Sequence, residues 1–112
     1  MASAGGIVRG VGELLLELLA PAGCAACDEA VRACVLFCPA CVHTVEPPAV
    51  GARVEGAFAY GGAVATAIVR MKYGGRPELA PRLGAAMGSV LAARVRGVDA
   101  VVSVPLHPRR VV

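Results

Sequence analysis

Four cysteines in two closely spaced pairs are the residues of this chain best suited to chemistry. They form two Cys-x-x-Cys motifs with ten residues between them: Cys24, Cys27, Cys38 and Cys41. In each motif both thiolates can face one ion, and two such motifs supply the four sulfur ligands of a tetrahedral Zn²⁺ site. Because the protein would fill all four positions, the ion would be structural rather than catalytic. The spacing therefore predicts a structural zinc site.

Other chemistry for the same thiols has to be weighed. An iron–sulfur cluster uses the same ligands, and either pair could form a redox dithiol or a disulfide. A thioredoxin-type pair lies between a strand and a helix, a setting that neither motif has. Cys34 and His43 are nearby and could replace one of the four ligands. We expect Cys34 to be a buried thiol instead, because residues 35–37 are apolar, and His43 to be exposed.

The composition limits the class of protein. Hydrophobic residues make up 57% of the 112, but only two Phe, two Tyr and no Trp are present, so the core would be marginal without a metal or a partner. The apolar stretch 11–22 is too short for a membrane span, and its two acids also argue against a signal peptide. We therefore expect a cytoplasmic protein, in which reduced thiols favour metal binding.

Charge is divided unevenly along the chain. Residues 1–63 hold three Arg against six acids, whereas residues 64–112 hold eight basic residues against two acids. A basic second half suits an anionic ligand such as a phosphate or nucleic acid. An ordinary solvated basic face would give the same composition, so this pattern leaves both interpretations open.

The elements that must position the cysteines follow from periodicity and turn residues. Residues 1–9 are expected to be a disordered tail. A helix over 10–19 and the cysteine segment form one unit, 10–48, which ends at the Pro47–Pro48 linker.

A second unit is expected over 52–112. It begins with a strand over 54–60, followed by helices over 63–72 and from about 78 to 94. The continuous apolar run 100–104 predicts a strand that is buried on both faces and needs neighbours in a parallel sheet.

Several stretches of the chain match a known pattern: LLLELLAP at 14–21, the two Cys-x-x-Cys motifs, FAYGG at 58–62, MKYGGRPELA at 71–80 and VPLHPRR at 104–110. Together they resemble the ComF family, competence-associated proteins that are phosphoribosyltransferase-like and carry an N-terminal zinc knuckle. The resemblance implies an α/β fold, in which a four-cysteine zinc knuckle precedes the first part of a type I phosphoribosyltransferase-like, Rossmann-like fold. The family continues with a loop that grips phosphoribosyl pyrophosphate. That loop is missing here, so we expect an incomplete domain that is inactive alone.

The resemblance also implies a pyrophosphate-binding role for Arg109 and Arg110, in the loop after the last predicted strand, and for Lys72 and Arg76, which flank a Tyr-Gly-Gly loop. Guanidinium groups suit phosphate oxygens, but solvated charges at the ends of elements would look the same. Catalytic residues are not assigned.

The family role implies further ligands and partners. Mg²⁺ and phosphoribosyl pyrophosphate are expected as ligands only of a full-length domain. Single-stranded DNA and the DNA-uptake machinery are the implied partners, and a partner or oligomer is expected to cover the last predicted strand. The alternatives are a non-enzymatic zinc module that binds protein or nucleic acid, or a non-functional remnant.

Overall fold

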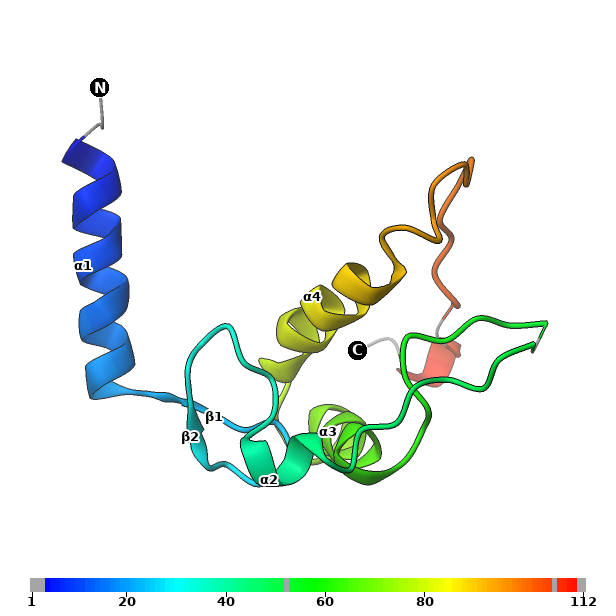
Figure 1. Cartoon of the computed structure of the whole chain (residues 1–112), viewed down its shortest axis with the longest axis horizontal. Helices are drawn as coiled ribbons and strands as arrows, with labels where there is room; N and C mark the ends of the chain where they lie inside the picture. The colour runs from blue at the N-terminus through cyan, green and yellow to red at the C-terminus, as the bar shows by residue number, and fades with distance from the viewer. Residues whose placement is uncertain (1–3, 52, 106, 111–112) are drawn as a thin grey trace.

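A cysteine-rich knuckle, residues 22–45, lies between a projecting N-terminal helix and a pair of helices (Figure 1). The structure is a computed structural model and describes residues 4–51, 53–105 and 107–110. The elements in chain order are helix α1 (Ala4–Leu19), strands β1 (Ala22–Gly23) and β2 (Ala30–Val31), helices α2 (Pro39–Val42), α3 (Gly62–Tyr73) and α4 (Leu79–Leu91), and the 3₁₀ turn η1 (Pro108–Arg110).

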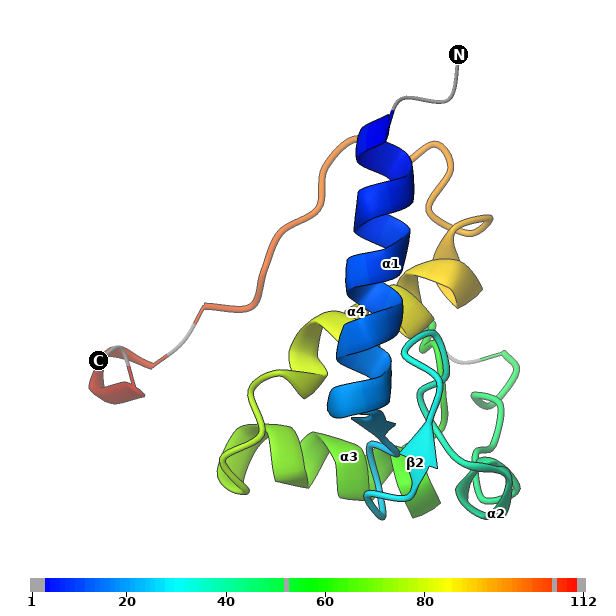
Figure 2. The same cartoon turned by 90° about the vertical axis from the view of Figure 1, so that its left-hand side faces the viewer.

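Helix α1 begins at Ala4, so residues 4–9, expected as part of a disordered tail, are helical. The helix ends just before Pro21, as the sequence predicts. In both views α1 rises from the knuckle and runs away from α3 (Figures 1 and 2). More than half of each described leucine side chain is exposed: Leu14, Leu15, Leu16, Leu18 and Leu19. Within the described residues, no helix combines the length and the apolar character needed to cross a membrane.

The two strands form an antiparallel ribbon with Ala22 opposite Val31 and Gly23 opposite Ala30. This ribbon closes the loop that carries the first cysteine pair. The second pair is built differently, because Cys38 is the N-cap of α2 and Pro39 occupies the first turn, where its missing N–H costs nothing. One pair thus lies in a loop and the other in a helical turn.

Helices α3 and α4 agree with the predicted helices, although α4 ends at Leu91 rather than near residue 94. The start of α3 depends on Gly62, which has a positive φ of 48°. A Cβ at this position would lie 2.4 Å from the Thr44 carbonyl oxygen, so only glycine fits. The Thr44 hydroxyl accepts a hydrogen bond from the Ala63 N–H at 2.9 Å. The chain just past α2 therefore caps α3.

The core is shared between the knuckle and the helix pair. Its buried members are Cys24, Ala25, Phe37 and Cys38 from the knuckle, Ala63, Val64 and Ala67 from α3, and Leu79 and Leu83 from α4. Small side chains dominate this set, as the composition predicts. The knuckle and the helices therefore bury each other, and neither has a separate core.

Two predicted strands are wrong. Residues 54–60 form bends and no strand. A backbone hydrogen bond joins them to the end of the cysteine segment, in which the Ala59 N–H donates to the Glu46 carbonyl at 3.0 Å. Residues 100–104 are extended but exposed, with Val101 at 90% and Val104 at 90% of full exposure. A strand needs a neighbour for its N–H and C=O groups, and among the described residues the two-residue strands β1 and β2 pair only with each other. The expected Rossmann-like sheet is therefore not confirmed, and the described fold is a small mixed one.

Candidate metal centre

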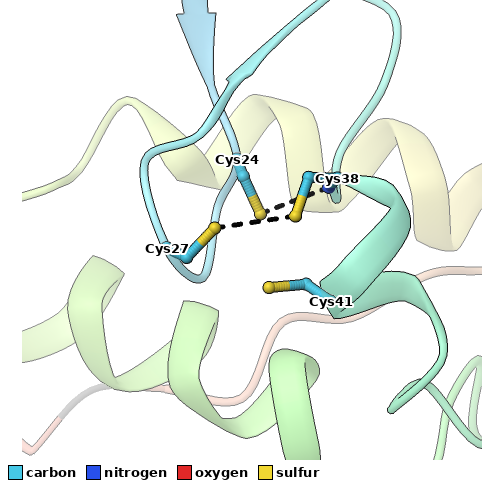
Figure 3. Close-up of side chains that lie close together, drawn as sticks. All are labelled: Cys24, Cys27, Cys38 and Cys41. Atoms are coloured by element: carbon cyan, nitrogen blue, oxygen red, sulfur yellow. Dashed lines mark hydrogen bonds between the residues drawn. The ribbon is translucent and has the colours of Figure 1, made fainter.

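The sulfurs of Cys24, Cys27, Cys38 and Cys41 all lie within 4.8 Å of one another. Figure 3 shows the four side chains converging from the first loop and from α2. The Cys27 and Cys38 sulfurs are 3.6 Å apart, well beyond the roughly 2 Å of a disulfide bond. A tetrahedron with Zn–S bonds of about 2.3 Å has edges of about 3.8 Å. The cluster thus has nearly the dimensions of a four-sulfur metal site, while the identity of the ion stays a prediction.

Backbone hydrogen bonds fix the first pair. The Cys24 N–H donates to the Glu29 carbonyl at 2.7 Å, and the Asp28 N–H donates to the Cys24 carbonyl at 3.0 Å. Asp28 has a φ of 67°, a left-handed conformation that Asp tolerates better than most residues and that reverses the chain directly after Cys27. Across the cluster, the Cys38 N–H donates to the Cys24 sulfur at 3.3 Å.

The thiols influence one another's ionisation. Burial raises the pKa of Cys24, but N–H groups of Cys38, Ala26 and Cys27 point at its sulfur and bring the pKa to about 6. The sulfurs of Cys38 and Cys27 beside Cys41 raise the pKa of that thiol to about 12. Repulsion between thiolates opposes charging all four groups together, and a bound dication removes this opposition.

The two spare candidates lie outside the cluster. His43 is exposed at the C-cap of α2, as expected. The expectation that Cys34 is buried is wrong, since this thiol is exposed. Of the neighbouring apolar residues 35–37, only Phe37 is buried in the core. Cys24 and Cys38 are the two buried thiols, whereas Cys27 is exposed and Cys41 is intermediate.

Three arginines from α3, the loop after it and α4 contact the knuckle, and no sequence motif connects them with the cysteines. Arg70 of α3 and Arg76 of the following loop both pair with Asp28. These bonds, of which the one from Arg70 has the larger effect, lower the pKa of the Asp28 carboxyl to about 2. Arg82 of α4 donates to the carbonyls of Gly23 and Val35, each at 2.7 Å. These contacts join positions 42 to 59 residues apart, so no local spacing could have revealed them.

The proposed phosphate ligands have different surroundings. Arg76 is engaged by Asp28 and Glu78, while Lys72 is exposed in the last turn of α3. Arg109 is exposed in η1, and the side chain of Arg110 lies outside the described part of the structure. Phosphate binding by this set therefore stays a prediction.

Comparison with protein-family models, with curated proteins and with solved structures finds no match for this chain. The case for its function therefore rests on the chemistry of its own residues.

Proposed function

We propose that this chain is a zinc-binding module, in which one structural Zn²⁺ is held by Cys24, Cys27, Cys38 and Cys41. The observation that carries the proposal is the convergence of four sulfurs within 4.8 Å of one another. Zn²⁺ suits four thiolates in a tetrahedron, whereas Mg²⁺ and Ca²⁺ prefer oxygen ligands. With four protein ligands, no open position is left for a reacting water.

The ion would join the two halves of the knuckle. One pair of ligands lies in the loop after β1 and the other at the start of α2, and Cys24 and Cys38 are also core residues against α3 and α4. A bound ion therefore fixes the surface on which both helices pack. Structural zinc contributes on the order of 10 kcal/mol to folding, more than a small core supplies when most of its side chains are alanine, cysteine or valine, with two leucines and one phenylalanine.

Metal analysis of protein purified under reducing conditions tests the proposal. We expect one zinc per chain, retained in Cys34→Ser and lost in Cys38→Ser. Cys34 is a matched control, because it lies between the two cysteine pairs and outside the cluster. Wild-type protein without zinc contradicts the proposal, and a visible charge-transfer spectrum with bound iron would assign the same thiols to an iron–sulfur cluster.

We also propose that the chain shares the family role of the ComF-like proteins that its sequence resembles, in DNA uptake and with a phosphoribosyltransferase-like domain. Support comes from the sequence stretches and from the exposed cations Lys72 and Arg109. The test is binding of phosphoribosyl pyrophosphate with Mg²⁺ to wild type and to Arg109→Ala. We expect weak binding that Arg109→Ala abolishes, with no pyrophosphate release by this chain alone. Equal binding by both proteins, or none by either, contradicts the phosphate role.

A further inference from the structure

The two cysteine pairs differ in what holds them rigid. Cys38 and Cys41 belong to a helical turn, in which the Val42 N–H donates to the Cys38 carbonyl at 2.9 Å. Cys24 and Cys27 lie in a loop with one equivalent bond, from the Asp28 N–H to the Cys24 carbonyl at 3.0 Å, after which Asp28 leaves the helical conformation with a φ of 67°. Metal affinity depends on ligands held near the productive geometry before the ion arrives. Contacts from outside its own segment therefore add to the local support of the first pair.

Arg70 of α3 supplies contacts at both ends of that loop. One guanidinium nitrogen, Nη1, donates to the Ala25 carbonyl at 2.9 Å and lies 3.5 Å from the Cys24 carbonyl. The other, Nη2, donates to the carboxylate of Asp28, the residue after Cys27. A planar fork of donors can make these bonds together, which a lysine ammonium does poorly.

These bonds bear on the direction of the sulfurs. The carbonyls of Cys24 and Ala25 belong to the first two peptide planes of the motif, so fixing them fixes the path from Cys24 toward Cys27. Asp28 is held in a left-handed conformation directly after Cys27. Arg70 is also a positive charge beside a site that carries a net negative charge with Zn²⁺ and four thiolates. Its side chain is 21% exposed, so water screens this charge only in part.

We propose that Arg70, acting with Asp28, is a positioning residue for the metal: it sets the geometry of the first cysteine pair without being a ligand. The inference rests on the proposed zinc site. Groups that orient metal ligands from outside the ligand shell typically change metal affinity roughly 10- to 100-fold when they are removed.

The experiment measures zinc affinity by competition with a chromophoric chelator for wild type, Arg70→Ala, Arg70→Lys, Asp28→Asn and Lys72→Ala. Lys72→Ala is the matched control, since it removes a positive charge from the same helix and Lys72 makes no ion pair among the described residues. We expect Arg70→Ala to bind zinc roughly 10- to 100-fold more weakly, with Arg70→Lys in between and Lys72→Ala unchanged. Asp28→Asn keeps a residue that tolerates the left-handed conformation and should weaken binding by several-fold.

Cobalt absorption separates positioning from general loss of structure. Co²⁺ in place of Zn²⁺ should keep the intense bands of four-sulfur coordination in Arg70→Ala, but with shifted band positions as the first pair relaxes. Lys72→Ala should give the wild-type spectrum. If Arg70→Ala fails to fold, Arg70→Lys decides, because it keeps the positive charge and removes only the planar fork that reaches the loop carbonyls and Asp28, whereas Asp28→Asn also weakens the pair with Arg76.

The outcomes separate the two proposals. Wild-type protein that binds no zinc overturns the metal site itself. Wild-type protein that binds one zinc, with affinities and cobalt spectra unchanged in Arg70→Ala and Asp28→Asn, overturns the role of Arg70 alone.

Discussion

The core unit, which is the knuckle together with α3 and α4, and the outer segments, α1 together with residues 99–105, use apolar residues in different ways. In the core unit, several small side chains are fully buried: Cys24, Ala25 and Ala67 are each at 0% exposure. In the outer segments, much larger side chains face solvent, such as Leu19 at 83% and Val102 at 85%. Hydrophobicity therefore does not by itself decide what is buried in this chain. A side chain is buried where the knuckle, α3 and α4 enclose it.

The surface area and the radius of gyration are both larger than those of a compact domain of this length. The accessible surface is 8951 Å², whereas a compact chain of 11.3 kDa exposes about 5,700 Å². The radius of gyration is 17.0 Å, against about 13 Å for a compact domain of this length. The excess surface reflects outer segments that project from the core unit (Figures 1 and 2).

The largest expected effect is on the core unit when the metal site is broken. Cys38→Ser, or removal of zinc by a chelator, should unfold α3 and α4 as well as the knuckle, because all three share one core. The lost contribution, on the order of 10 kcal/mol, exceeds the stability of a small domain. Circular dichroism and amide hydrogen exchange measure this. Protected α3 amides in metal-free protein would show that the helices are stable alone.

A core leucine and an outer leucine should respond differently to the same truncation. Leu79 is fully buried, so Leu79→Ala should lower the free energy of unfolding by about 2–5 kcal/mol. Leu18 is 73% exposed, so Leu18→Ala should change it by less than about 0.5 kcal/mol. Urea denaturation of the zinc-loaded proteins measures both. Equal effects would contradict the contrast between the two regions.

The junction between the knuckle and α3 gives a smaller effect. Gly62→Ala adds a Cβ too close to the Thr44 carbonyl at a positive φ, and should cost about 1–3 kcal/mol of stability. Gly61 is the control, because a Cβ there meets nothing within 4 Å and its φ of 172° is ordinary extended backbone. Thermal unfolding compares the two variants. A Gly61→Ala variant that is less stable than Gly62→Ala would place the constraint elsewhere.

The smallest effect on stability is expected in the outer segments, where a change should alter association instead. Val102 is 85% exposed in an extended apolar run, which is a template for pairing with other chains. Val102→Lys should leave zinc content and unfolding unchanged and reduce self-association in light scattering after size exclusion. A wild-type protein that is already a stable monomer contradicts this prediction.

Local spacing alone determined several features of this protein. Two cysteines three apart in sequence can face one ion whatever the rest of the fold does, so the spacing by itself is enough to predict a metal site at the four cysteines. The 63–72 helix is equally predictable, since the apolar stripe and the glycines that end it are local signals. The early start of α1 at Ala4 is less predictable, because Gly5 and Gly6 weaken a helix, although Ile7 and Val8 continue the apolar spacing toward Val11.

Tertiary structure alone decided what depends on neighbours. The run 100–104 has the composition of a buried strand, but a strand exists only where another strand completes its hydrogen bonds, and the described residues offer none. Cys34 lies beside apolar residues in sequence and is nevertheless exposed, because burial requires an opposing surface. The bonds from Arg70 and Arg82 to the knuckle likewise join residues far apart in the chain. Chelation by each cysteine pair is set within four residues, whereas burial, strand pairing and support of the ligands are set by contacts that only the folded chain brings together.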